Sequence, residues 1–139
     1  MRHAIRLAQT AREQGDMPVG SVVACDGKII GEGMEAVRAD NDLTAHAEIR
    51  AVQDACKRLK ILDLTGCILI TTVEPCFMCS FVIRSARIAR VVIGRAVPHI
   101  GGFSSSCPIL VNPNIPGWSR PPSVVAGVLE EECSALFGS

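Results

Sequence analysis

Two short motifs constrain this chain more than any other feature: His46-Ala47-Glu48 and Pro75-Cys76-Phe77-Met78-Cys79. Imidazole and thiolate groups are preferred zinc ligands, and the motifs offer three of them. Structural zinc sites use four protein ligands, whereas catalytic sites use three and leave the fourth position to water. The motifs therefore predict Zn²⁺ held by His46, Cys76 and Cys79 in an open site.

The spacing of the motifs places both at helix starts. Cys76 and Cys79 are three positions apart, so a helix carries their sulfurs on one face. Pro75 is tolerated at a first helical turn, and a helix N-terminus lowers the pKa of a thiol toward the thiolate that zinc requires. His46 is expected in the first turn of the preceding helix. Two facing helix N-termini would then close three ligands around one ion.

Glu48 lies two residues beyond His46, so its side chain is expected beside the metal and not on it. Zinc lowers the pKa of a coordinated water to about 7. A carboxylate in this position can take a proton from that water and return it to the reacting molecule. We therefore expect Glu48 to be the catalytic residue.

A structural zinc module is the alternative interpretation. A Cys-x-x-Cys pair alone is common in closed zinc knuckles, and His99 or Cys107 could supply a fourth ligand. A glutamate close to a histidine is often just a solvated helix residue. The combination of both motifs at successive helix starts, with a strand between them, favours the catalytic interpretation.

Composition indicates one domain, residues 1–139, with 48% hydrophobic residues, which is rich for its size and suggests a homodimer or larger homo-oligomer. Basic and acidic residues balance, 14 against 14, so an extended polyanion is not the expected partner, although a local basic patch is not excluded. The seven cysteines show no disulfide-framework spacing, which is typical of a reducing cytoplasm. No signal pattern or membrane-length apolar run is present. We expect a cytoplasmic, soluble protein.

Periodicity predicts alternating helices and strands. Asp26-Gly27 is a strong hairpin signal, and the strand–helix–strand run around Cys76 implies a parallel crossover. The class is α/β, a three-layer α/β/α sandwich with a mixed five-stranded sheet. The expected helices are 2–14, 45–59, 76–86 and 130–137; the strands are 19–25, 28–34, 67–72, 90–93 and 123–128; and a long connection over 95–122 is expected to form a lid.

With these motifs the chain resembles the cytidine and deoxycytidylate deaminase superfamily, nearest the branch of bacterial tRNA adenosine deaminases and guanine deaminases. The matching stretches are Met1–Ala8, Pro18-Val19-Gly20, Ile30–Gly33, Asp42–Ile49, Glu74–Cys79 and Arg90–Gly94. The resemblance implies a zinc-dependent hydrolytic deaminase in which Glu48 shuttles protons to a ring nitrogen and then to the departing amine. The backbone around Ala47 would face the substrate ring.

Two departures from the family pattern bear on the substrate. Relatives usually carry an asparagine two residues after the Gly-Glu-Gly segment, where this chain has Glu35. An amide both donates and accepts, whereas a carboxylate only accepts, so Glu35 suits a ring edge that presents N–H donors. The RNA-editing relatives also tend to end in a basic, aromatic tail, and Leu136–Ser139 contains no such run.

The remaining candidates are less specific. Glu74 and Phe103 are predicted substrate contacts, and Phe103 or Trp118 in the 95–122 segment could stack on a flat ring. Arg84, Arg87 and Arg90 are expected to form a solvated helix face or a subunit contact.

The sequence thus predicts hydrolytic deamination of a free nucleobase or a similar small heterocyclic amine. The first alternative is a tRNA adenosine deaminase, which would make nucleic acid the partner. The second is the non-catalytic zinc module.

Overall fold

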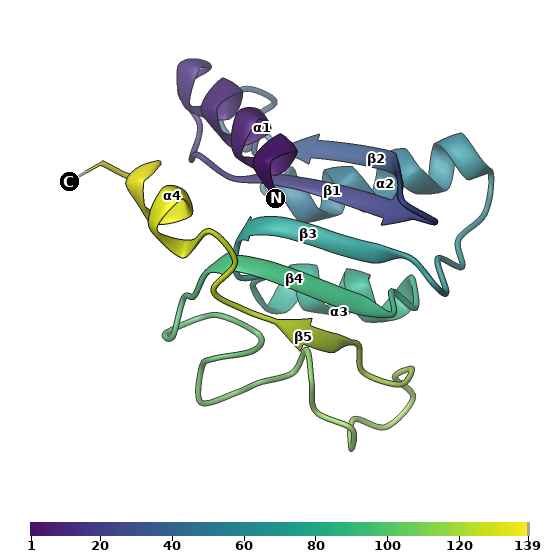
Figure 1. Cartoon of the computed structure of the whole chain (residues 1–139). Coiled ribbons are helices and arrows are strands. Elements are labelled where there is room, and N and C mark those ends of the chain that lie inside the picture. Colours follow the sequence, from purple (N-terminus) through teal and green to yellow (C-terminus); the bar gives the residue numbers. More distant parts are fainter. Residues whose placement is uncertain (139) are drawn as a thin grey trace.

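A mixed five-stranded sheet forms the middle layer of the computed structural model, which describes residues 1–138 (Figure 1). The strand order is β2-β1-β3-β4-β5; β1 is antiparallel to β2 and β3, while β3, β4 and β5 are parallel. The strands are β1 (Gly20–Cys25), β2 (Lys28–Met34), β3 (Ile68–Val73), β4 (Arg90–Arg95) and β5 (Ser123–Val125). The predicted mixed sheet and parallel crossover are confirmed.

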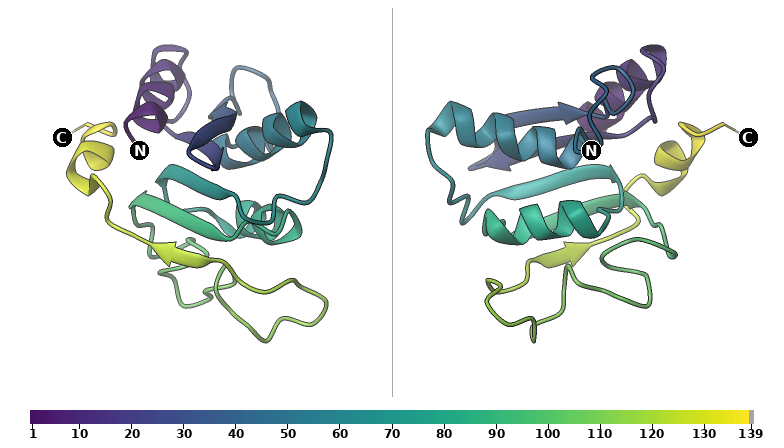
Figure 2. Two further views of the ribbon diagram at one scale, coloured as in Figure 1. Left: turned by 45° about the vertical axis from the view of Figure 1, so that its right-hand side comes forward. Right: turned by 180° about the vertical axis from the view of Figure 1, so that it is seen from behind.

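Helices cover both faces of the sheet. They are α1 (Arg2–Glu13), α2 (Ala47–Leu59), α3 (Phe77–Ser85) and α4 (Glu130–Ala135). Figure 2 shows α2 and α3 together on one face, with α1 and α4 on the other. The main core lies under α2 and α3 and includes Leu69, Ile83 and Val91, and a smaller cluster joins α1 to α4. The predicted three-layer α/β/α sandwich is therefore confirmed.

Glycines in β2 seat α2 closely against the sheet. A Cβ atom at Gly33 would lie 2.2 Å from the backbone oxygen of Ala47, and one at Gly31 would lie 2.4 Å from that of Ala51. Only residues without a side chain permit this approach. The contact fixes the first turn of α2, which follows His46, against the end of β2.

Element boundaries shift by a few residues from those expected. The Asp26-Gly27 hairpin is confirmed, with both residues at positive φ (51° and 75°), as a type I′ turn requires. The strand expected over 123–128 ends at Val125, because the chain turns at Gly127 (φ 79°) toward α4. Within residues 1–138, no helix combines the length and apolarity needed to cross a membrane. The last residue of the predicted domain, Ser139, lies outside the described part.

Arg84 corrects one prediction about the surface. Arg87 and Arg90 are exposed, as a solvated face requires, but Arg84 is 2% exposed. Its guanidinium donates to the backbone oxygens of Ile109, Asn112 and Ser119, and it lies 5.0 Å from the centre of the Trp118 ring. A buried cation with these partners anchors the β4–β5 loop (residues 96–122) to α3.

Candidate active site

The three predicted ligands converge at one point. The nitrogen and sulfur atoms of His46, Cys76 and Cys79 all lie within 4.8 Å of one another. His46 Nδ1 is 3.7 Å from Cys76 Sγ and 3.5 Å from Cys79 Sγ. A tetrahedral zinc with ordinary bond lengths requires N···S separations of about 3.6 Å, so the donor set fits Zn²⁺. The group has three members within residues 1–138, and neither His99 nor Cys107 joins it; the closed four-ligand site is not formed there.

Helix starts position these ligands. His46 is the N-cap of α2 and Cys76 is the N-cap of α3, both with extended backbone, while Cys79 follows in the first turns of α3. The expected helix starts were therefore one or two residues early. The side chains of His46 and Cys76 lie at the starts of two adjacent helices, and the Cys79 sulfur lies within reach of both.

The three ligand side chains differ in how readily they lose a proton. Hydrogen bonding with Cys79, together with His46, lowers the pKa of Cys76 to about 4. The hydrogen bond to Cys76 in turn raises the pKa of His46 to about 9. The hydrogen bond with Cys76, together with burial, raises the pKa of Cys79. Cys76 therefore carries the thiolate that zinc requires, whereas His46 and Cys79 would release protons when the metal binds.

Glu48 lies beside the ligands, on the second residue of α2. Its side chain is 4% exposed, and its Oε2 atom is 3.6 Å from Cys79 Sγ. Burial raises the pKa of Glu48 to about 7. A carboxyl group with such a pKa can both accept and release a proton at neutral pH.

A cavity of about 340 Å³ opens onto these groups. His46, Glu48 and Cys76 form its metal-side wall, and Glu35 also lines it. The rest of the lining is largely apolar and includes Val97 and Ile100 of the β4–β5 loop. The volume lies at the lower end of the range for small-molecule sites and suits a single planar ring.

Glu35 and Ala47 are brought together at this cavity. Glu35 Oε2 accepts a hydrogen bond of 3.2 Å from the Ala47 backbone N–H, and the Glu35 side chain is 8% exposed. Burial raises the pKa of Glu35. The Glu35 side chain is therefore buried against the first turn of α2 and does not point into solvent.

The other two predicted substrate contacts are placed differently. Glu74 lines the cavity, but its carboxylate is hydrogen-bonded to Val97, Phe103 and Ser104 of the β4–β5 loop. The Phe103 ring is not brought to the cavity; it packs half-buried against the main core. Trp118 makes an edge-to-face contact with Phe81 of α3, and it too is absent from the cavity wall.

Sequence reasoning missed the aromatic residue that does reach the cavity. Phe137 lines it, and the Arg95 guanidinium lies 4.4 Å from the centre of the Phe137 ring, a cation–π distance. Phe137 was expected to close the last helix, but α4 ends at Ala135. No local pattern marks a residue so far along the chain as a neighbour of β4.

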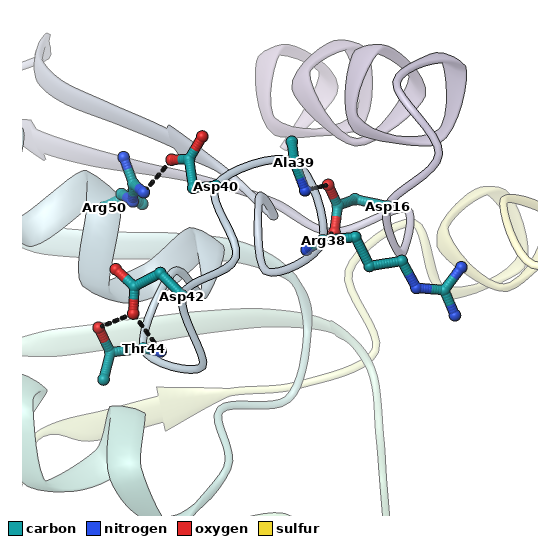
Figure 3. Close-up of polar contacts among 7 residues, drawn as sticks. All are labelled: Asp16, Arg38, Ala39, Asp40, Asp42, Thr44 and Arg50. Carbon is teal, nitrogen blue, oxygen red and sulfur yellow. Dashed lines mark hydrogen bonds and ion pairs between the residues drawn. The ribbon is translucent and has the colours of Figure 1, made fainter.

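The β2–α2 loop (residues 35–46) delivers His46 and is held by buried and exposed carboxylates (Figure 3). Asp16, which is 7% exposed, accepts hydrogen bonds from the backbone N–H groups of Arg38 (2.7 Å) and Ala39 (3.0 Å). Asp42 accepts from the Thr44 N–H at 2.8 Å. The sequence does not single out Asp16, because the amides that it binds lie 22 and 23 residues further along the chain.

Comparison with known proteins identifies the class. Residues 1–95 match the family described as the cytidine and deoxycytidylate deaminase zinc-binding region. The chain therefore belongs to this zinc-binding deaminase family, as the resemblance implied.

Two individual relatives match most of this chain. The chain is 38% identical over 115 residues to a tRNA-specific adenosine deaminase from Aquifex aeolicus, which covers 83% of this chain and 76% of that protein. It is also 38% identical to a tRNA(Ile)-lysidine synthase from Deinococcus radiodurans, matching 99% of this chain but only 23% of that longer protein.

Two solved structures share the whole fold. A structure from a study of A-to-I editing by tRNA deaminases at the wobble position superposes with a TM-score of 0.91 at 34% identity, covering 98% of this chain and 96% of that one. A guanine deaminase from Bacillus subtilis gives 0.63 at 32% identity, covering 98% and 88%. The likeness thus includes proteins described as tRNA deaminases and as a guanine deaminase.

Proposed function

We propose that this chain hydrolytically deaminates an adenosine base presented by tRNA. The observation that carries the reaction is the buried Glu48 carboxylate, placed 3.6 Å from a ligand sulfur at the end of a ring-sized cavity. The tRNA substrate is supported by the 34% identity and the TM-score of 0.91 with the wobble-editing structure. This substrate was the first alternative of the sequence analysis, and the comparisons support it better than the free base favoured there.

The chemistry divides between the metal and the protein. Zinc, when held by His46, Cys76 and Cys79, supplies a nucleophile at neutral pH by acidifying water. Glu48 would accept one proton from the water and deliver it to the ring nitrogen. It would then take the second proton from the oxygen now bonded to the ring carbon and deliver it to the departing amine. The water oxygen remains on the ring carbon and ammonia departs, so atoms and charge balance.

An RNA substrate places a requirement on the cavity. A deaminase reaches a base only after the nucleotide has left its stack, so the site must accept one extruded ring. The cavity of about 340 Å³ and its apolar wall suit that role. Phe137 offers a ring face at the wall, with Arg95 stacked on it.

Homodimer assembly remains a prediction from the apolar composition.

Glu35 favours a second candidate, a free base with an N–H donor edge. Within residues 1–138, only one of its two carboxylate oxygens accepts a hydrogen bond, and the donor is the Ala47 N–H. A carboxylate at the cavity would repel acceptor atoms of a ring and accept hydrogen bonds from its N–H donors. A guanine-like, isocytosine-like or triazine-like edge presents such donors. Mismatched polar contacts in such pockets discriminate strongly between substrates.

Ammonia release by zinc-loaded protein tests both candidates. The panel comprises an anticodon stem-loop with an adenosine, free adenosine, guanine, isocytosine and ammeline, and Glu48→Ala is the control. Turnover of the stem-loop alone would support the proposal, and Glu48→Ala should reduce it by at least about 10²-fold. Turnover of a free base alone would replace it with the second candidate. Glu35→Asn then distinguishes the two, because it should weaken donor-edge bases without harming adenosine.

If zinc-loaded protein releases no ammonia from any of these compounds, the proposed function fails for both candidates. Zinc content measured on the same samples shows whether Glu48→Ala retains the metal, so that loss of activity is not confused with loss of the ion.

A further inference from the structure

Glu74 is a buried carboxylate whose hydrogen bonds run away from the metal. The side chain is 3% exposed and comes immediately before Pro75 and Cys76. Its Oε1 atom accepts from the backbone N–H groups of Phe103 (2.8 Å) and Ser104 (2.6 Å). Its Oε2 atom accepts from the Val97 N–H and the Ser104 hydroxyl, both at 2.6 Å. A carboxylate offers about four acceptor positions, and all four are used within the chain.

The segment bound in this way is one wall of the cavity. We name residues 97–104 the wall segment; Val97, His99 and Ile100 in it line the cavity. Gly101 lies directly over the carboxylate, because a Cβ atom there would be 2.0 Å from Glu74 Oε1. The two sides are also joined by the Gly102 N–H, which donates to the Pro75 oxygen at 2.8 Å. The wall segment is therefore fixed to the residues that carry the ligand Cys76.

We propose that Glu74 is a positioning residue that fixes the wall segment relative to the metal ligands, so that the cavity keeps the shape of the substrate ring. Its carboxylate acts through the backbone of 97–104 and does not contact the substrate. This replaces the sequence-based interpretation of Glu74 as a substrate contact. The inference deepens the proposed function, since the wall matters for catalysis only if the cavity holds the reacting base.

Glu74→Gln tests the proposal with little change of shape. The amide keeps one acceptor oxygen, but its NH₂ group must face one of the two donor pairs, so at least one backbone N–H loses its partner. In zinc-loaded protein, amide hydrogen exchange in peptides covering 97–104 should accelerate at least about tenfold, while peptides from α2 stay protected. KM for the best substrate of the panel should rise at least about tenfold, with a smaller change in kcat.

Gly101→Ala provides an independent way to displace the same contact. It should reproduce the faster exchange of the wall segment and the higher KM. Added to Glu74→Ala it should have little further effect, because the clashing carboxylate is gone; this non-additivity identifies a direct coupling between the two sites. Glu131→Gln, on the exposed surface of α4, is the matched control and should change neither quantity.

Three outcomes would overturn the proposal. They are unchanged exchange in 97–104, acceleration spread equally over the whole chain, and an opened wall segment with an unchanged KM. If wild-type protein deaminates nothing in the panel, the proposed function fails, while hydrogen exchange and the Glu74–Gly101 coupling still show whether Glu74 holds the wall segment.

Discussion

Two loops border the metal site, and they are held in different ways. The β2–α2 loop is short and is bound through Asp16, which belongs to the segment between α1 and β1. The β4–β5 loop is long and is bound at both ends to the strand–helix unit that carries Cys76 and Cys79. Glu74 holds its beginning, and Arg84 holds its later part.

The difference indicates that the β2–α2 loop can change independently of α3, whereas the β4–β5 loop cannot. Asp16 lies between α1 and β1 and binds the loop that carries His46. A substitution at Asp16 should therefore alter that loop and leave the contacts of α3 unchanged. The β4–β5 loop cannot move without changing its contacts to α3, because an anion near the start of α3 and a cation near its end bind different parts of the loop. Each anchor can be removed singly, which makes the comparison testable.

The largest effect is expected at Arg84. Arg84→Ala leaves the backbone oxygens of Ile109, Asn112 and Ser119 without their buried donor, so the free energy of unfolding should fall by about 3 kcal/mol or more. Urea denaturation measures the loss. Zinc content should be retained, because Arg84 lies in the last turn of α3, whereas Cys76 caps its start.

Arg84→Lys is the control that keeps the charge. It should recover only part of the lost stability, because a lysine cannot reproduce the fork of donors that reaches three carbonyls. Full recovery by lysine would show that the positive charge matters and the directed hydrogen bonds do not. Loss of zinc from either variant would contradict the separation between this anchor and the metal ligands.

A smaller effect is expected at Asp16. Asp16→Asn keeps one acceptor oxygen but turns an NH₂ group toward the Arg38 or Ala39 N–H, which should cost about 1–3 kcal/mol. Thermal unfolding measures the cost, and amide hydrogen exchange locates it. Residues 36–45 should exchange faster while 97–104 remain protected. Equal acceleration of exchange in both segments would contradict the claim that the two loops are held independently, since it would show that they open together.

Sequence patterns predicted the layers and the ligands because both depend on local spacing. The i, i+3 relation of Cys76 and Cys79, and the hairpin at Asp26-Gly27, are properties of a few neighbouring residues. The sheet order β2-β1-β3-β4-β5 then brought His46 to the cysteines. Only the element boundaries differed, by one to three residues at helix starts and at the ends of helices and strands.

The cavity wall could not be predicted in the same way because it depends on contacts across the chain. Phe103 and Phe137 are both aromatic residues in or near irregular segments, and composition does not distinguish them. The position of Gly101 over Glu74 directs the chain so that Phe103 reaches the core, while the turn at Gly127 returns Phe137 to β4. Arg84 looked like a surface residue because its partners are backbone oxygens, which leave no mark in the sequence.

The smallest effect is expected at Asp42, the exposed anchor of the β2–α2 loop (Figure 3). Hydrogen bonds from the Thr44 hydroxyl and N–H lower its pKa below the ordinary 3.8. A carboxyl group whose pKa is lower in the folded state stabilises the fold above its unfolded pKa and loses that contribution as the pH falls through its folded pKa. Asp42→Ala should therefore lower Tm slightly at pH 7, and its difference from wild type should disappear well below pH 3.8.

Asp63, which binds Thr65 in the same way at the far end of α2, provides the matched variant Asp63→Ala. Both variants should show the same pH dependence of Tm, but only Asp42→Ala should speed hydrogen exchange in residues 36–45. An equal response of that segment to both variants would mean that Asp42 contributes only general surface charge.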